Sequence, residues 1–241
     1  MDRGAYTPRH HFFTTTPLPC PYLEGRVERR LVTELVGPES SLLHDILTLS
    51  GFRRSHSIVY APVCQNCQAC IPVRIPTRRF KPGKTQRRLW KYNSDLVARE
   101  RPAQATREQF NLFHTYLLHR HGEGDMAMME EDDFETMVSD SPVDTAIFEF
   151  RDPQGTLLAA CLTDSVRGGY SAVYSFYDPD IGKRSLGTYM IMWLVEHAKS
   201  QNLDYVYLGF WIRDSRKMAY KALFHPLESY CNGKWCDLNI F

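Results

Sequence analysis

One stretch of the chain decides how its second half folds: Asp178-Pro179-Asp180-Ile181-Gly182-Lys183-Arg184-Ser185-Leu186-Gly187-Thr188. It joins an aromatic run that is typical of a strand to an apolar run that predicts a helix from Ser185 onward. Gly182 and Gly187 allow the backbone to approach a phosphate closely, and the positive end of the helix dipole favours such an anion. Lys183 and Arg184 add positive charge at the same place. The alternative is an ordinary capped helix with Ser185 as its N-cap.

The elements around this stretch follow a recognisable order. A capping box of Thr106 and Gln109 starts the first helix of the second half. The pattern then predicts two helices, a three-strand meander, a helix, a strand, a short helix and two closing strands, over residues 106–121, 131–138, 145–150, 156–164, 170–177, 185–199, 205–210, 215–223, 227–230 and 234–238. This order predicts an acetyltransferase-like (GNAT) α/β domain.

The first half predicts a second unit, so that the whole chain is of the α+β class. Strands are expected over residues 29–36, 55–61 and 71–77, and helices over residues 40–51 and 85–92. Pro72 and Pro76 interrupt the third strand, and proline cannot donate to a ladder, so we expect this strand at a sheet edge. We place the domain boundary after residue 103. The predicted domains are a basic, cysteine-containing α+β domain over residues 1–103 and the GNAT-like domain over residues 104–241.

Charge is strongly segregated although the net charge is only +1. Residues 53–101 hold twelve Arg or Lys against two acidic residues, and residues 123–152 hold eleven Asp or Glu against one Arg. A basic segment of this density favours a polyanionic partner. The alternative is that the two segments neutralise each other across a domain contact.

The composition is typical of a globular protein in the cytoplasm. Hydrophobic residues make up 43% of the 241 residues and charged residues 24%. No stretch approaches the roughly 20 apolar residues of a membrane span. The first 16 residues are polar and lack the apolar core of a secretory signal. The seven cysteines, an odd number, therefore predict reduced thiols rather than a disulfide framework.

Several strings together resemble the arginyl- and leucyl-tRNA–protein transferase family. They are PCPYL at residues 19–23, GFRRS at 51–55, YAPVCQNCQACIPVR at 60–74, SAVYSFYDP at 171–179, SLGTY at 185–189, YLGFWI at 207–212 and KMAYK at 217–221. The short length and the PCPYL string are similar to the bacterial branch. That branch transfers leucine from leucyl-tRNA to proteins that begin with Asp or Glu, which marks them for degradation by the N-end rule. The longer eukaryotic branch transfers arginine to the same acceptors.

The resemblance implies aminolysis of an ester, in which the α-amine of the acceptor protein attacks the aminoacyl carbonyl. The α-amine has an ordinary pKa of about 8, so a useful fraction is neutral and positioning matters more than a strong base. The oxyanion needs N–H donors, which the backbone beside residues 173–177 can supply. The ribose oxygen needs a proton, for which Tyr174, Tyr177 and Tyr189 are candidates. Asp178 is expected either to hold the acceptor's amine or to form an Asx turn with Pro179.

An acidic acceptor also needs a cation, and the carrier needs a basic surface. The candidates for substrate binding are Arg53, Arg54, Arg74, Lys217 and Lys221, with Phe176 as an aromatic contact. The candidates for tRNA binding lie on the basic segment and at the start of the helix near residue 185, with Trp90 and Tyr92 interleaved for stacking. They are Arg78, Arg79, Lys84, Arg87, Arg88, Lys183 and Arg184.

Three cysteines form a C-x2-C-x2-C pattern: Cys64, Cys67 and Cys70. The family resemblance implies Cys20 as a fourth member and links this region to metal binding and redox sensitivity. Four thiolates suit zinc or an iron–sulfur cluster. A redox-responsive thiol site and a purely structural turn are the alternatives, and the transfer reaction itself requires no cofactor.

Two other functions use part of the same pattern. An N-acyltransferase using acyl-CoA would share the predicted fold, but it leaves the basic first half unexplained. A metal-containing RNA-binding module would use the cysteines and the basic segment, but it leaves the second half unexplained. The transferase interpretation accounts for both halves, with leucyl-tRNA and acidic acceptor proteins as partners of a monomer.

Overall fold

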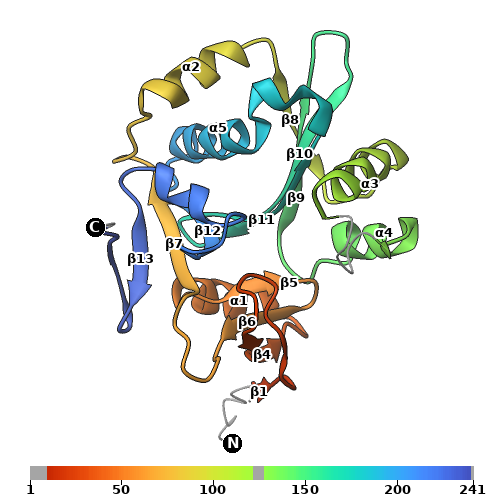
Figure 1. Ribbon diagram of the computed structural model, residues 1–241. Coiled ribbons are helices and arrows are strands. Elements are labelled where there is room, and N and C mark those ends of the chain that lie inside the picture. Colours follow the sequence, from red (N-terminus) through yellow and green to blue (C-terminus); the bar gives the residue numbers. More distant parts are fainter. Residues whose placement is uncertain (1–9, 122–127, 240–241) are drawn as a thin grey trace, which may run out of the picture.

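A computed structural model describes residues 10–121 and 128–239 of the chain. They form a mixed α/β structure with one large sheet, one small sheet and a two-stranded ribbon (Figure 1). No helix within these residues is long and apolar enough to cross a membrane. Residues 1–9, in the polar N-terminal stretch, and residues 122–127, at the start of the acidic segment, lie outside the described residues.

The large sheet has eight strands in the order β14-β13-β7-β12-β11-β10-β9-β8. Their bounds are β7 (Ile71–Pro76), β8 (Val97–Pro102), β9 (Thr145–Arg151), β10 (Leu157–Val166), β11 (Gly169–Tyr177), β12 (Tyr205–Trp211), β13 (Glu228–Cys231) and β14 (Lys234–Asp237). All neighbouring strands are antiparallel except β11 and β12, which are parallel. The predicted meander is β9, β10 and β11.

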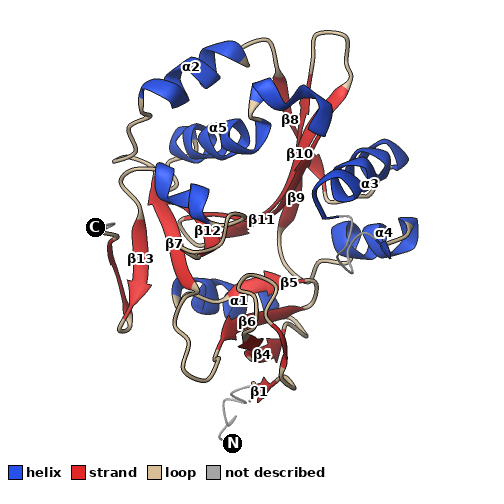
Figure 2. Ribbon diagram, in the orientation of Figure 1, coloured by secondary structure: helices blue, strands red, loops and turns tan. Residues whose placement is uncertain are grey.

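Helices cover both faces of the large sheet (Figure 2). One face carries α3 (Arg107–His121) and α4 (Glu131–Ser139), and the other carries α2 (Lys84–Tyr92) and α5 (Leu186–Ser200). Along β10, Ala160 and Leu162 pack under α3 and α4, whereas Ala159 and Cys161 pack toward α5. A strand covered on both faces is largely apolar, which is why residues 157–162 of β10 show no polar alternation.

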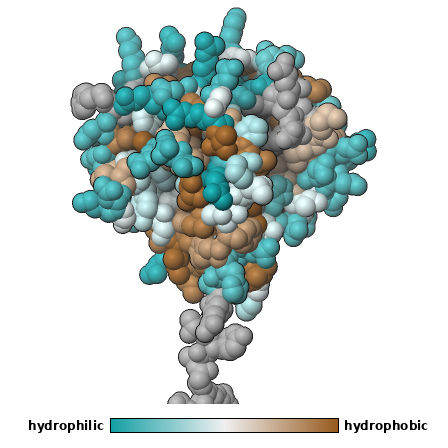
Figure 3. All heavy atoms as spheres, turned by 60° about the horizontal axis from the view of Figure 1, so that its bottom comes forward, coloured by the Kyte–Doolittle hydropathy of each residue, from teal (hydrophilic) through white to brown (hydrophobic). Residues whose placement is uncertain are grey.

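The small sheet and one helix form the N-terminal end. Its strand order is β1-β4-β6-β5, and the ribbon of β2 and β3 lies beside it. The bounds are β1 (Phe13–Thr14), β2 (Leu18–Pro19), β3 (Val27–Glu28), β4 (Arg30–Glu34), α1 (Ser40–Leu49), β5 (Arg53–Ser55) and β6 (Ile58–Pro62). Most of the exposed large apolar side chains belong to this end, and Figure 3 shows the apolar surface gathered there. On α1, Leu42, Ile46 and Leu49 form an outward apolar stripe.

Most predicted elements are found within a few residues of their expected bounds, but the short strands β1, β2 and β3 were not predicted, and there are four further differences. Residues 55–61 belong to a hairpin of β5 and β6 rather than to one strand. The predicted helix over residues 215–223 is a 3-10 helix, η3 (Ala219–Leu223). A second 3-10 helix, η2 (Pro179–Arg184), precedes α5, and strand β8 was not predicted. The capping box of Thr106 and Gln109 is confirmed by reciprocal hydrogen bonds of 3.1 and 3.2 Å.

The expectation of an edge strand over residues 71–77 is wrong. Strand β7 lies inside the sheet, between β13 and β12. It pairs with β13 only at Val73 and Arg74. Neither Pro72 nor Pro76 is paired with β13, so the backbone N–H that proline lacks is not needed on that side. Strands β7 and β8 both precede residue 104, so the large sheet takes strands from both sides of the predicted domain boundary.

A buried ion pair joins the N-terminal end to the large sheet. The Arg54 guanidinium on β5 donates to both oxygens of Asp164 on β10, at 2.6 and 2.7 Å, and also to the carbonyl of His56. Both side chains are essentially inaccessible to solvent. Thr145 donates to the same carboxylate at 2.8 Å, and the ring of His44 on α1 lies 3.5 Å from it. Burial lowers the pKa of His44, so this ring is neutral and Arg54 supplies the positive charge.

Removing Arg54 should therefore destabilise the fold strongly. Arg54→Met leaves the Asp164 charge buried without its partner, which costs about 3–5 kcal/mol. The control is Arg78→Met, because the pair of Arg78 with Asp204 is exposed on both sides and such pairs contribute about 1 kcal/mol or less. Unfolding in urea measures both variants. Equal losses of stability would contradict the role of the buried pair.

Candidate functional site

Strands β11 and β12 separate halfway along the sheet. They pair only at three positions, from Gly169 opposite Tyr205 to Ser171 opposite Tyr207. Beyond this point both strands are irregular on their other side. Val173 is an extra residue relative to β10, and Leu208 is an extra residue relative to β7. Bulges bend and twist strands, so the two strands diverge and leave backbone groups of β11 without a strand partner.

Arg53 on β5 occupies the point where the strands separate. Its Nη2 donates to the carbonyl of Ala172 at 2.6 Å and also to the carbonyl of Val173. Its side chain crosses Gly209, which has a φ of +70°. A Cβ at this glycine would lie 2.6 Å from both Cδ and Nη1 of Arg53. Glycine is therefore required at 209 both for its backbone conformation and for the close approach of Arg53.

Lys221 on η3 contacts Phe210, the residue of β12 that follows Gly209. Its Nζ donates to the carbonyl of Phe210 at 2.6 Å, and the residue is only 7% exposed. Burial and the nearby Arg53 guanidinium hold the pKa of Lys221 well below its usual range. Within the described part of the chain, neither Arg53 nor Lys221 forms an ion pair with an acidic side chain.

Tyr177 connects the end of β11 to the start of α5. A Cβ at Gly187 would lie 3.2 Å from its ring, so the ring is packed against the first turn of the helix. Its hydroxyl accepts a hydrogen bond from Arg120 on α3 at 2.8 Å, and its ring lies 4.9 Å from that of Tyr116. The Tyr177 proton therefore stays available for donation to a ligand.

The start of α5 is not closed by a side-chain cap. Ser185 occupies the N-cap position in a left-handed conformation (φ 46°, ψ 50°), and its hydroxyl makes no capping hydrogen bond. Arg184 is turned away to a bidentate pair with Asp95, at 2.9 and 2.8 Å. Lys183 is exposed. The N–H groups of Leu186 and Gly187 therefore have no capping side chain and can bind another partner, whereas that of Thr188 donates to the carbonyl of Ser185.

The structure does not bring the three predicted catalytic side chains together. Tyr174 packs under α3, with its ring 5.8 Å from that of Phe113, and burial raises its pKa. Tyr189 lies on the opposite face of the sheet, against Trp90. The Asp178 carboxylate accepts from the N–H of Asp180 at 2.9 Å, which is the geometry of the Asx turn.

Three of the predicted substrate-binding residues have structural partners. Arg54 is held by Asp164, as described above. The Arg74 Nε donates to Glu228 at 2.8 Å, and its guanidinium lies 3.5 Å from the ring centroid of Tyr205. Phe176 is completely buried in the core between the sheet, α3 and α4. Lys217 is exposed. Arg53 and Lys221 remain as the cations of this set that adjoin the separated strands.

Helix α2 presents the predicted tRNA-binding cations on its outer face. Lys84, Arg87 and Arg88 are exposed, whereas Gln86 is buried and donates to the carbonyl of Leu223 at 3.1 Å. This bond docks α2 on η3, the segment that carries Lys221. Two of the other predicted cations have acidic partners here: Arg78 binds Asp204, and Arg79 binds Glu228 and Asp237.

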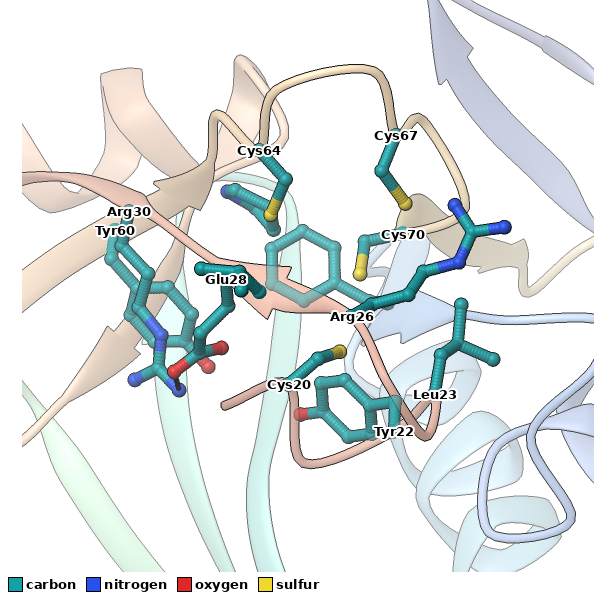
Figure 4. A pocket seen from close by; sticks show the side chains of 13 residues that line it. Cys20, Tyr22, Leu23, Arg26, Glu28, Arg30, Tyr60, Cys64, Cys67 and Cys70 are labelled. Atoms are coloured by element: carbon teal, nitrogen blue, oxygen red, sulfur yellow. Dashed lines mark ion pairs between the residues drawn. The ribbon is translucent and has the colours of Figure 1, made fainter. Parts of the chain in front are cut away.

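The four cysteines line one pocket in the N-terminal half. Cys20, Cys64, Cys67 and Cys70 point into it, with Tyr22 at its base (Figure 4). Burial and the other three thiols raise the pKa of Cys70 to about 12. Cys64 exchanges weak contacts of 3.4 and 3.6 Å with the backbone of Arg29. Among the residues that the structure describes, no group of three or more His, Cys, Asp or Glu side chains is arranged to hold a metal ion. The arrangement therefore does not support zinc.

Two residues of the site were missed by the sequence analysis. Gly209 lies within the YLGFW string, but its role depends on contact with Arg53, which is 156 positions earlier in the chain. Arg120 lies at the end of α3, and no local pattern indicates that it reaches Tyr177. Both contacts depend on the tertiary fold.

The fold is shared with a solved domain of another protein. The C-terminal domain of a protein described as a lysylphosphatidylglycerol synthetase, from Agrobacterium fabrum, superposes with a TM-score of 0.50. The match covers 69% of this chain and 61% of that chain at 14% sequence identity. At this identity the likeness concerns the fold alone.

Family models place the chain among the aminoacyl-tRNA–protein transferases. The model "Arginine-tRNA-protein transferase, N terminus" matches residues 18–88, and "Arginine-tRNA-protein transferase, C terminus" matches residues 108–231. The chain belongs to the arginine-tRNA-protein transferase family.

Curated relatives match over nearly the whole chain. A protein of Paramagnetospirillum magneticum is 54% identical over 98% of this chain and 96% of its own length. A protein of Rhodospirillum rubrum is 52% identical over the same shares of the two chains. Both carry the name aspartate/glutamate leucyltransferase.

Gly209→Ala should impair transfer by displacing Arg53. The methyl group would collide with the guanidinium, and a misplacement of about 1 Å at a reacting centre can reduce turnover ~10²-fold. Gly233→Ala is the matched control, because Gly233 has a φ of +78° with no atom within 4 Å of its Cβ position. Both variants carry backbone strain of about 1–3 kcal/mol, and only the first should lose activity. Transfer assays and thermal unfolding compare the two variants. Equal transfer activity would show that the position of Arg53 at Gly209 does not matter for the reaction.

Proposed function

We propose that this protein transfers leucine from leucyl-tRNA to the N-terminal amine of proteins that begin with Asp or Glu, marking them for degradation. Family membership and the names of the curated relatives support this proposal. The observation that carries it structurally is the docking of basic helix α2 on η3. In this proposal a carrier bound to α2 extends past η3, the segment that carries Lys221, to the separated strands β11 and β12.

The second half, from residue 104 onward, acts in this proposal as a GNAT-like acyl-transfer domain. Separation of the parallel pair creates the place for the aminoacyl ester, and the open start of α5 faces the terminal nucleotide of the tRNA. The first half, residues 1–103, supplies Arg53, the basic face of α2 and the cysteine pocket. The protein acts as a monomer in the cytoplasm, and the reaction needs no metal.

The chemistry is one of positioning and proton transfer. The α-amine of the acceptor attacks the ester carbonyl, a C–N bond forms, and the C–O bond to the ribose breaks. One proton of the amine must leave and the ribose oxygen must gain one. Tyr177 is the best placed phenol for this second step, because it packs against the start of α5, whereas Tyr174 packs under α3 and Tyr189 is buried on the opposite face of the sheet. Its own hydroxyl already accepts from Arg120, which supports charge that develops on the phenol oxygen.

The direct test is a transfer assay with purified protein. Leucyl-tRNA and arginyl-tRNA, each carrying a labelled amino acid, are incubated with peptides that begin with Asp, Glu, Asn or Gln. We expect label on the Asp and Glu peptides from leucyl-tRNA only. Label from arginyl-tRNA instead would identify an arginyltransferase, and no label from either donor would reject the proposed function.

Removing cations from α2 should weaken the binding of tRNA without regard to its sequence. The double variant Arg87→Gln and Arg88→Gln removes two exposed charges, so the slope of log affinity against log salt should fall by about 1 for each phosphate that these side chains neutralise. Arg107→Gln is the control, because Arg107 is exposed on α3, on the other face of the sheet. Filter binding at several salt concentrations measures the slopes. Unchanged slopes in the double variant would place the tRNA elsewhere.

A further inference from the structure

Two basic side chains, the half-buried Arg53 and the buried Lys221, contact consecutive residues of β12. Arg53 crosses Gly209, and Lys221 donates to the carbonyl of Phe210. Their charges interact, since the guanidinium of Arg53 lowers the pKa of Lys221. The two side chains come from different parts of the fold, β5 and η3, and converge where β11 and β12 have separated.

These cations lack the acidic partners that other buried cations have. Arg54 and Arg74, which are about as buried as Lys221 and more buried than Arg53, each bind a carboxylate directly. In residues 10–121 and 128–239, Arg53 and Lys221 bind only backbone carbonyls. Carbonyl oxygens carry only partial charge, so the Arg53 guanidinium keeps an uncompensated positive charge, and Lys221 adds a second one when it is protonated. Such a site favours an anionic ligand.

The remaining hydrogen-bond donors fit a carboxylate. Arg53 uses Nη2 for the carbonyls of Ala172 and Val173, and its Nε and Nη1 make no hydrogen bond within the described chain. Lys221 uses one of its donors for Phe210. A guanidinium edge and an amine beside it can hold the two oxygens of one carboxylate. Arg53 is half-buried rather than enclosed, so a ligand can reach it.

On the basis of the proposed function, we propose that Arg53 and Lys221 bind the side-chain carboxylate of the acceptor's N-terminal Asp or Glu. Lys221 takes up a proton from solvent as this carboxylate binds. The same site rejects Asn and Gln, because a neutral amide supplies no negative charge to compensate Arg53 or to stabilise the protonated form of Lys221.

The proton uptake follows from the surroundings of Lys221. Burial and, to a smaller extent, Arg53 from β5 disfavour its charged form, and the thiol of Cys70, as a thiolate, would favour it. The pKa of Cys70 is itself raised to about 12, so this thiol is neutral and contributes little at physiological pH. The ligand carboxylate adds the missing negative charge and raises the pKa of Lys221. Binding of an acidic acceptor should then weaken as pH rises above the pKa of Lys221 in the free protein.

Calorimetric titration tests both parts of the proposal. Peptides that begin with Asp or Asn, otherwise identical, are titrated into the full-length protein in buffers of different ionisation enthalpy. The difference between the two peptides cancels the contribution of their α-amines. For the unaltered protein we expect uptake of up to one proton for the Asp peptide relative to the Asn peptide. Equal proton exchange for the two peptides would overturn the linkage.

Three variants distinguish the effect of the charge at residue 221 from the effect of proton uptake, with a lysine elsewhere on the surface as the control. Lys221→Met should reduce kcat/KM for the Asp peptide about 100-fold and remove the preference over Asn, because Arg53 alone must neutralise the carboxylate. Lys221→Arg stays charged throughout, so it should keep the preference for Asp but show no proton uptake. Lys234→Met is the control, since Lys234 is exposed on β14 and should change neither quantity.

Leucyl-tRNA binding and the melting temperature confirm that each variant is folded. If Lys221→Met folds, binds leucyl-tRNA and still prefers Asp to Asn, this inference is wrong although the proposed function stands. If the unaltered protein transfers no leucine to the Asp peptide, the proposed function itself fails. Loss of the preference in Lys221→Met together with its retention in Lys221→Arg supports the carboxylate site.

Discussion

The ion pair of Arg54 and Asp164 holds the N-terminal end of the protein against the large sheet, and the candidate site depends on it. It connects β5 to β10 in the interior, where a broken pair costs several kcal/mol. Because successive residues of a strand point to opposite sides, anchoring Arg54 sends the neighbouring Arg53 toward the separated strands. One short strand therefore carries a structural arginine and a functional one. Their adjacent positions in the sequence hide the difference between them.

Separation of β11 and β12 determines how the other groups of the site are arranged. It removes the strand partner of two carbonyl groups, and Arg53 supplies the missing donors. By contrast, Arg74, Arg151 and Arg184 each have a carboxylate within 3.1 Å. The fold can provide carboxylates for cationic side chains, but among the described residues it provides none for Arg53 and Lys221 at the separated strands. This difference supports a ligand-binding role for the two side chains.

Much of the fold could be predicted from the sequence, whereas little of the site could. The helix after Ser185 and the meander of β9 to β11 have strong local periodicity, so their patterns were sufficient. The position of β7 was not predictable, because Pro72 and Pro76 indicate an edge strand and only the short pairing with β13 makes an interior position possible. Local sequence also does not distinguish Arg53 from Arg54, or the Asx turn of Asp178 from a catalytic carboxylate. Those distinctions depend on contacts between residues about 100 or more positions apart, or on backbone geometry.

The interior position of β7 has a consequence for synthesis of the chain. Strand β7 leaves the ribosome well over 100 residues before β12 and β13, the two strands between which it lies. Until they emerge, both of its edges are exposed, and such edges are prone to pair with other chains. The apolar residues of β7 therefore need protection during translation. Since pairing over such a sequence separation is slow, completion of the sheet is expected to be the last step of folding.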